Sequence, residues 1–314
     1  MMRIVGADVE AVFGCVPGKA VDNLAELVPL VGAEKAESIV HATGFATRRV
    51  AQAGTDVIDL ALPAAKCALE GVSAADVGAV ITVSFSNRDR FPALATRLQN
   101  ALGLPDGIAA YDISMACSGW VYGLFAAAQM VNACGKKVLL VDGDVQSAWI
   151  DRSDANTLAV MGDGATATLL APGEGRWEFG FLTDGAGAAT LSCRDRIEMD
   201  GFGVFRFVAG PVRRFLESFM RGSELLAGSP PQAFVPHQAN MYMVRQLAEA
   251  LGVRDALVGS GERFANTGSC SAVLSLAAGD GVKGTALLAG FGAGLSAAAA
   301  ITTLGGYRRG VVEA

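Results

Sequence analysis

The feature that most constrains the fold is an alternation of short, β-rich apolar runs with longer runs rich in alanine and leucine. Apolar runs of about four to eight residues favour strands, and longer apolar runs favour helices. This alternation is typical of α/β proteins, in which helices cover the sheets. The predicted strands are residues 76–84, 109–116, 137–142, 233–236 and 285–289, and the predicted helices are 91–102, 118–133, 202–220, 241–251 and 272–278.

The composition narrows the class of protein. The chain has 314 residues, 52% of them hydrophobic and 18% charged, which excludes intrinsic disorder and allows one large domain or two ordinary ones. The net charge of −6 argues against a general nucleic-acid surface. The uncharged run 284–307 contains six glycines, so we interpret it as strand, glycine turn and strand rather than a membrane span. The N-terminal stretch carries Asp8 and Glu10 and does not fit a signal peptide.

The cysteines indicate a reducing compartment. They stand at positions 15, 67, 117, 134, 193 and 270, with no tight metal-binding spacing. Scattered cysteines of this kind are typical of reduced thiols in a cytoplasmic protein. We therefore expect no metal and no cofactor. We expect the chain to divide near 171–173, into residues 1–171 and 172–314.

Two residues lie where chemistry is often found in α/β proteins, at the ends of strands. His237 follows a predicted strand and Pro236, and Cys117 stands between a predicted strand and an apolar helix. A thiol at a helix N-terminus has its pKa lowered by the helix dipole, so Cys117 is predicted to ionise below about 8.5. From position alone, a catalytic role and a structural one stay open for both residues. The other histidine, His41, is interpreted as a surface or turn residue.

Two further segments carry weaker signals. Asn266 lies in a loop of small residues before a predicted helix, where an asparagine turn or helix cap is the ordinary interpretation. The loop 290–295, Gly-Phe-Gly-Ala-Gly-Leu, follows a strand and is able to present backbone N–H groups to an oxyanion.

Together, these segments resemble the β-ketoacyl-acyl carrier protein (ACP) synthase III family of the thiolase superfamily. The similarity extends from about Gly44 to Leu304. It implies an α/β thiolase fold, in which two intimately packed similar halves form a layered α-β-α-β-α core. The matching segments are Asp112-Ile-Ser-Met-Ala-Cys117-Ser-Gly-Trp, Gly162-Asp-Gly-Ala165, Val235-Pro-His237-Gln-Ala-Asn, Ala265-Asn266-Thr-Gly-Ser and Gly290-Phe-Gly-Ala-Gly-Leu-Ser.

The resemblance implies a mechanism. Cys117 takes an acyl group from an acyl thioester, acyl-CoA or acyl-ACP, while the backbone N–H groups of Cys117 and Ala293 stabilise the oxyanion. His237 and Asn266 then bind the carbonyl of a malonyl thioester, most naturally malonyl-ACP. Decarboxylative condensation releases a β-ketoacyl thioester, a step of fatty acid biosynthesis. The resemblance also implies a homodimer in which Phe91 closes the partner's acyl pocket.

Several positions depart from the family pattern. Ser38, Ala42, Ala155 and Phe202 replace residues that usually hold coenzyme A, and Tyr242 stands where a basic residue is common. Two explanations remain open. The acyl donor would arrive on a carrier protein or bind through other contacts to CoA, or the enzyme is a specialised relative in secondary metabolism, cofactor synthesis or signalling. An exposed basic rim for an acidic carrier protein is predicted from Arg48, Arg49, Arg206, Arg213, Arg214 and Arg245. Arg88 and Arg90, beside Phe91, would suit a carboxylate on the substrate.

Two other functions remain open from the sequence. One is a relative that moves the Cys117 acyl group to a hydroxyl or amine without decarboxylation. The other is a non-catalytic ketosynthase-like subunit that pairs with a different chain, although such subunits usually lose the nucleophile.

Overall fold

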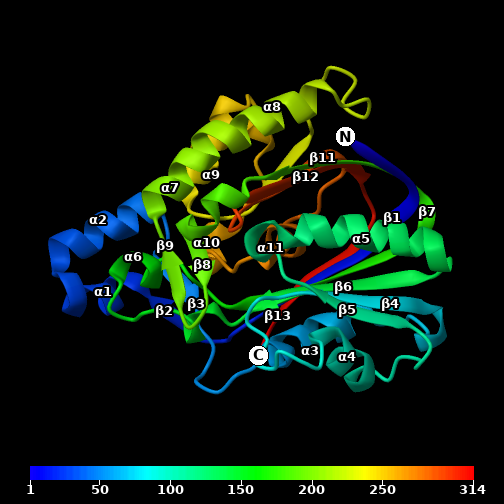
Figure 1. The fold of residues 1–314 in the computed structure, drawn as a ribbon, viewed down its shortest axis with the longest axis horizontal. Helices are drawn as coiled ribbons and strands as arrows, with labels where there is room; N and C mark the ends of the chain where they lie inside the picture. Colours follow the sequence, from blue (N-terminus) through cyan, green and yellow to red (C-terminus); the bar gives the residue numbers. More distant parts are fainter.

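The computed structural model describes residues 1–314 and places helices and strands in five layers (Figure 1). From top to bottom in Figure 1 these are helices, a sheet, two central helices, a second sheet and more helices. The strands are β1 (Met2–Val16), β2 (Ala20–Asp22), β3 (Thr47–Arg49), β4 (Val77–Val83), β5 (Ala109–Ile113), β6 (Lys137–Asp144), β7 (Gly164–Thr183), β8 (Leu191–Cys193), β9 (Ile197–Met199), β10 (Ala233–Pro236), β11 (Gly284–Gly292), β12 (Ser296–Leu304) and β13 (Arg308–Glu313). The helices are α1 (Asn23–Val31), α2 (Ala33–Thr43), α3 (Val57–Ala68), α4 (Leu94–Ala101), α5 (Gly119–Cys134), α6 (Ala155–Leu158), α7 (Gly201–Phe207), α8 (Arg213–Arg221), α9 (Met241–Ala250), α10 (Gly261–Phe264) and α11 (Cys270–Ala278).

Two long antiparallel strands, β1 and β7, connect the sheet layers. The first part of β7 pairs with β6, which continues in parallel to β4 and β5. The second part of β7 pairs with β12, which continues to β11 and β10. The predicted division at 171/172 falls inside β7, and it stays a prediction.

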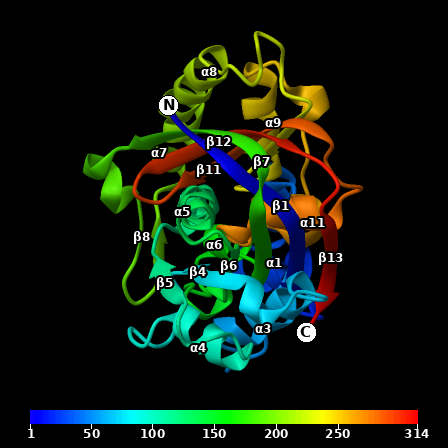
Figure 2. The same cartoon turned by 90° about the vertical axis from the view of Figure 1, so that its right-hand side faces the viewer.

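The central layer consists of α5 and α11, which both contact strands of the two sheets. Figure 2 shows α5 nearly end-on between the sheet layers. The helix is apolar on nearly all sides, as the sequence indicated, because both of its faces are covered. One apolar core therefore joins both sheets through these helices.

Successive residues of β6 point into different layers. Val138 and Leu140 belong to the central core, whereas Leu139 and Val141 pack with α3 and α4 in the core below. A strand that is buried on both faces has apolar residues at successive positions, so the sequence of β6 shows no alternation of apolar and polar residues. A third core packs α7, α8 and α9 on β11 and β12, which confirms the predicted α-β-α-β-α layering.

Most predicted elements are present, with two differences. The helix expected from Phe91 begins at Leu94, because the Asp112 carboxylate accepts the N–H groups of Leu94 and Ala95 at 2.7 and 2.9 Å and caps the helix there. The helix expected over 202–220 is interrupted by a π-helical turn, Val208–Val212, which contains Pro211.

The run 284–307 forms β11, a glycine turn and β12, as predicted. No helix in the chain combines the length and apolar character that a membrane crossing requires.

Candidate active site

Cys117 lies in a 3₁₀ turn, Ala116–Ser118, between the end of β5 and the start of α5. Ala116 has a φ of 43°, which an alanine rarely adopts, so the backbone is strained immediately before the thiol. Gly119 lets this turn approach β4, since a Cβ there would lie 2.3 Å from Val83 Cγ1. The turn places Cys117 at the helix N-terminus, as the sequence indicated.

The glycine loop packs directly against this turn. A Cβ on Gly292 would lie 2.8 Å from both Cβ and Sγ of Cys117, and a Cβ on Gly290 would lie 2.8 Å from the Ser118 Cα. Only glycine permits both approaches. The N–H groups of Ala293 and of Cys117 itself are near enough to stabilise the Cys117 thiolate. These are the two backbone donors that the sequence predicted for an oxyanion hole.

Burial raises the pKa of the Cys117 thiol to about 11, with the Asp144 carboxylate adding to the increase and the two backbone N–H groups opposing it. The prediction of a lowered pKa was therefore wrong. Loss of hydration outweighs the stabilisation of the thiolate at the start of α5. Unliganded Cys117 is a neutral thiol at pH 7.

His237 follows β10, and its backbone N–H donates to Ala289 at 2.7 Å, which fixes it beside β11. The imidazole Nδ1 lies 2.8 Å from Ser271 Oγ, and the ring meets Phe291 edge to face at 5.6 Å. Burial lowers the pKa of His237 to about 4, and the Gly268 backbone opposes this only partly. His237 is thus a neutral imidazole at pH 7, able to donate one hydrogen bond.

Asn266 is held with its amide in one orientation. Its Oδ1 accepts the Gly268 N–H at 3.0 Å, so its Nδ2 faces the other way, toward the Ala239 carbonyl at 3.4 Å. One Nδ2 hydrogen is left for a ligand. Ala265 before it has a φ of 58°, so strained alanines precede both Cys117 and Asn266.

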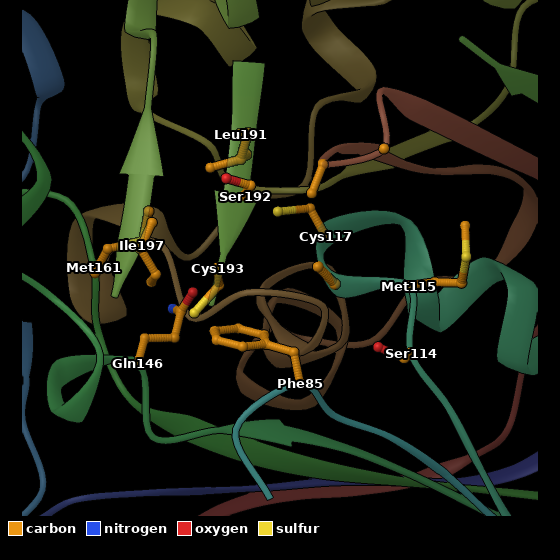
Figure 3. A pocket seen from close by; sticks show the side chains of 13 residues that line it. Phe85, Ser114, Met115, Cys117, Gln146, Met161, Leu191, Ser192, Cys193 and Ile197 are labelled. Carbon is orange, nitrogen blue, oxygen red and sulfur yellow. The ribbon is translucent and has the colours of Figure 1, made fainter. Parts of the chain in front are cut away.

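Two cavities meet at Cys117. The larger, of about 250 Å³, is lined mainly by apolar side chains and is shown in Figure 3. The smaller, of about 90 Å³, contains His237 and Asn266. Cys117, Met161 and Leu191 line both. A thiol, a neutral imidazole and an amide that lie far apart in sequence therefore share one chamber, beside a separate pocket that opens on the thiol.

Sequence reasoning missed several residues around this chamber. Asp144 is fully buried behind it, and its Oδ1 accepts from Ser84, Ser86 and the Phe85 N–H. Ser271 and Gln146 contact the predicted residues from other elements. Their partners lie 34 and 120 positions away in the chain, and no local sequence signal marks such pairs.

The remaining predicted residues are dispersed. Phe91 lies on the surface with 86% of its area exposed and lines neither cavity. Ser38 and Ala42 are exposed on α2, Phe202 is exposed on α7, and Ala155 is buried.

The predicted basic rim needs a correction. Arg48 is buried, bonded to Asn23 and Glu26, and Arg49 binds the carbonyls of Pro17 and Gly18, so neither belongs to an exposed rim. Their role is structural because their guanidinium groups are satisfied within the fold. The four remaining arginines lie on α7, α8 and α9: Arg206, Arg213, Arg214 and Arg245.

The five-layered fold, with a cysteine at a central helix N-terminus and a histidine and an asparagine from the other half, defines a thiolase-fold enzyme of acyl transfer. A family model described as 3-oxoacyl-[acyl-carrier-protein (ACP)] synthase III matches residues 111–185, and the model of its C-terminal part matches 229–304. The β-ketoacyl-[acyl-carrier-protein] synthase III of Geobacillus kaustophilus is 34% identical over 281 residues, which cover 87% of this chain and 89% of that protein. The chain belongs to the β-ketoacyl-ACP synthase III family.

Other relatives agree with this assignment. The synthase III of Serratia proteamaculans is 34% identical over 76% of this chain and 80% of that protein. A solved 3-oxoacyl-(acyl-carrier protein) synthase from Burkholderia xenovorans superposes with a TM-score of 0.94 at 29% identity, covering 100% of this chain and 98% of that one. The priming β-ketosynthase of the R1128 polyketide pathway gives a TM-score of 0.87 at 30% identity, covering 96% and 97%. Both the family and the thiolase fold are thus confirmed.

Proposed function

We propose that this enzyme loads an acyl group on Cys117 and condenses it with a malonyl thioester to give a β-ketoacyl thioester. The observation that carries the proposal is the meeting of Cys117, His237 and Asn266 in one chamber, next to a mainly apolar pocket that opens on the same thiol. The pocket suits an acyl chain, and the chamber suits the reacting carbonyl groups.

In the first half-reaction, Cys117 Sγ attacks the thioester carbonyl carbon. Because the pKa of the free thiol is raised, its proton leaves as the new C–S bond forms and ends on the departing thiol. The N–H groups of Cys117 and Ala293 face the developing oxyanion. Removing one such donor typically costs about 3 kcal/mol of transition-state stabilisation.

In the second half-reaction, His237 and Asn266 Nδ2 donate to the carbonyl oxygen of the malonyl thioester. Carbon dioxide leaves, negative charge develops on that oxygen, and the resulting carbanion attacks the acyl carbon on Cys117. The C–S bond then breaks, which releases the β-ketoacyl thioester, and the Cys117 thiolate takes up a proton from water to restore the thiol. A neutral imidazole suits this role because it donates a hydrogen bond and is not consumed as an acid.

An acidic carrier protein is proposed to dock beside α7 and α9, both of which begin at the chamber. Arg206 and Arg245 are exposed there, Arg245 in an exposed ion pair with Glu262, and Phe202 and Tyr242 expose 69% and 55% of their surface. Arg213 and Arg214 extend the positive surface along α8. With neutral residues at Ser38, Ala42 and Phe202, this surface favours malonyl-ACP as the second substrate, and acyl-CoA or acyl-ACP as the first.

A homodimer is proposed through β5, which forms an edge of the sheet and has exposed or half-exposed residues along its length. An unpaired edge strand invites pairing with a second copy. Phe91, whose ring is largely exposed, would enter the partner's acyl pocket. Light scattering of the wild type and of Phe91→Glu tests this: a monomeric wild type contradicts the proposal.

A cytoplasmic location is also proposed. All six cysteines are free thiols, which is typical of proteins in a reducing compartment.

The direct test of the reaction is the intact mass of the protein after incubation with acyl-CoAs and acyl-ACPs. An adduct should form in the wild type and not in Cys117→Ala, and it should disappear as a β-ketoacyl product forms when malonyl-ACP is added. Cys193→Ala, which removes the other thiol of the pocket, is the matched control and should keep the adduct. An adduct that ignores malonyl-ACP would instead favour simple acyl transfer, and no adduct at all would contradict the proposal.

A further inference from the structure

The amide of Gln146 has only one orientation that satisfies its hydrogen bonds. One side of the amide faces the carbonyl oxygens of Gly162 and Asn266, both at 2.8 Å. Both are acceptors, so the nitrogen must face them and donate both of its hydrogens. The oxygen, Oε1, consequently points away from these carbonyls.

This oxygen has no donor within the protein. Neither a side chain nor a backbone N–H bonds to Oε1, although Gln146 is only 3% exposed. Gln146 lines the larger pocket with Cys117, as Figure 3 shows, and Oε1 is not sealed in the interior as Asp142 and Asp144 Oδ2 are. The pocket therefore presents a fixed hydrogen-bond acceptor to whatever fills it.

The rest of the pocket limits what that occupant is. Phe85, Met115, Met161 and Ile197 supply an apolar wall, and no charged side chain lines the cavity. Arg88 and Arg90 are absent from the lining, so a carboxylate on the acyl chain would be buried without a counter-charge. The cavity volume of about 250 Å³ lies just below the range of about 300–1,000 Å³ that is typical of pockets for drug-sized ligands, which favours a short- to medium-chain acyl group.

We propose that the acyl donor of this enzyme carries an uncharged hydrogen-bond donor, most simply a hydroxyl group, which binds Gln146 Oε1 in the larger pocket. The substrate class is then a short- to medium-chain hydroxyacyl thioester. This inference rests on the proposed acylation of Cys117, and it adds a specificity-determining residue to that reaction.

The physical reason is the cost of an unpaired polar atom. A plain alkyl chain that fills the pocket displaces water from Oε1 and leaves it unsatisfied, which costs about 1–3 kcal/mol. A hydroxyl at the right carbon restores the bond. A site built around such a bond discriminates strongly against an analogue that lacks the hydroxyl.

The experiment compares hexanoyl-CoA with its 3-, 4-, 5- and 6-hydroxy isomers, measuring kcat/KM for acylation of Cys117 by intact mass. Asp144 Oδ2 and Gln146 Oε1 both border Gly268, since a Cβ there would lie 3.1 and 3.4 Å from them. Burial raises the pKa of the Asp144 carboxyl to about 7, so at pH 8 that carboxyl is mostly ionised and has no proton to donate to Oε1. The wild type should prefer one hydroxylated isomer over hexanoyl-CoA by at least about tenfold. A hexanoyl rate equal to or above that of every hydroxylated isomer would overturn the inference.

Gln146→Met keeps the size of the side chain and removes the acceptor, so the preference should fall to about one or reverse. Because the ratio is taken within each variant, a general loss of activity from the weakened contact to Asn266 cancels. Gln129→Met, the same replacement on the exposed side of α5, should keep the wild-type ratio. If Gln146→Met retains the preference, Gln146 is not its source. If no thioester acylates Cys117 at all, it is the proposed reaction that fails.

Discussion

The hydroxyl oxygens of Ser118 and Ser296 lie 2.7 Å apart, in the buried contact between the turn that carries Cys117 and the glycine loop. Ser296 Oγ also donates to the Ala293 carbonyl at 2.6 Å. Ser118 is able to donate its hydroxyl proton to Ser296 Oγ while Ser296 donates its own to the Ala293 carbonyl, so the three residues form a hydrogen-bonded chain. This chain joins the residue after Cys117 to Ala293, and so fixes the separation of the two proposed oxyanion donors.

Replacing Ser296 by alanine should therefore impair acylation through positioning. We expect kcat for Cys117 acylation to fall about tenfold with KM nearly unchanged, because the loss is confined to the transition state. Ser296→Thr keeps the hydroxyl and should recover most of the rate. Quenched-flow mass spectrometry measures both constants, and a change confined to KM would show that Ser296 acts on substrate binding instead.

The raised pKa of Cys117 predicts how the thiol reacts with a small alkylating reagent. At pH 8 only about one Cys117 in a thousand is a thiolate if its pKa is about 11. Its rate of modification by iodoacetamide should rise about tenfold per pH unit from pH 7 to 10, followed by mass analysis of the Cys117 peptide. The urea-unfolded chain is the control, in which the rate should level off above about pH 8.5. The same levelling in the folded protein would refute the burial effect.

Ser271 is predicted to set the tautomer of His237. Its Oγ accepts the Gln238 N–H at 3.0 Å and lies 2.8 Å from His237 Nδ1, so its own proton is available to donate to Nδ1. The imidazole proton would then sit on Nε2, as the donor for the malonyl carbonyl. In Ser271→Ala we expect decarboxylation to slow about tenfold while acylation of Cys117 stays unchanged.

Nitrogen-15 NMR tests this tautomer directly. The chain has only two histidines, so a His41→Gln background leaves one imidazole to observe. Its Nε2 should be protonated in the parent and partly deprotonated in Ser271→Ala, and the ring should titrate near pH 4. Ser275→Ala, one turn further along α11, should leave the signals in place. An Nδ1–H tautomer in the parent would contradict the assignment.

The proposed carrier surface predicts a salt-dependent effect. Arg206→Glu and Arg245→Glu should each raise KM for malonyl-ACP several-fold, and the difference should shrink at high salt as the charges are screened. Arg254→Glu, near the other end of α9, is exposed and should have no such effect. Steady-state kinetics at two ionic strengths measure this. Equal effects at all three positions would show that net charge, rather than docking, is responsible.

The fold was predicted correctly because strand and helix signals are local. Cys117, His237 and Asn266 were singled out as candidates because short motifs around them, at strand ends and a helix start, resemble the family. It could not predict Gln146, whose function depends on carbonyls that approach it from other parts of the chain. The pKa of Cys117 was predicted in the wrong direction because burial depends on β11, which packs against the thiol from the other half. The arginines show the same limit, since sequence does not reveal that Arg48 is enclosed by Asn23 and Glu26.

Asp142 provides a stability prediction that is independent of catalysis. The residue is fully buried on β6, neither carboxylate oxygen has a firm hydrogen-bond partner, and burial, with the neighbouring Asp144 charge, raises its pKa well above the usual value. When folding raises the pKa of a group, the folded protein loses stability as the pH rises toward and through the folded-state pKa, because the folded form holds that proton more tightly than the unfolded form and must give it up. Replacing Asp142 by asparagine removes this loss and offers amide hydrogens to the unpaired hydroxyls of Thr166 and Ser269.

Asp142→Asn should therefore unfold less readily than the parent at high pH, by about 1–3 kcal/mol, the cost of an unsatisfied buried polar group. This difference in the free energy of unfolding should decline as the pH falls toward 4. There the Asp142 carboxyl of the parent is protonated in the folded state and increasingly so in the unfolded state, so its ionisation no longer opposes folding. Urea unfolding between pH 4 and 9 measures the difference. Asp106→Asn, at an exposed aspartate, controls for the change of net charge and should show no such trend. A destabilisation that grows with pH would mean that the Asp142 carboxylate is stabilised in its charged form.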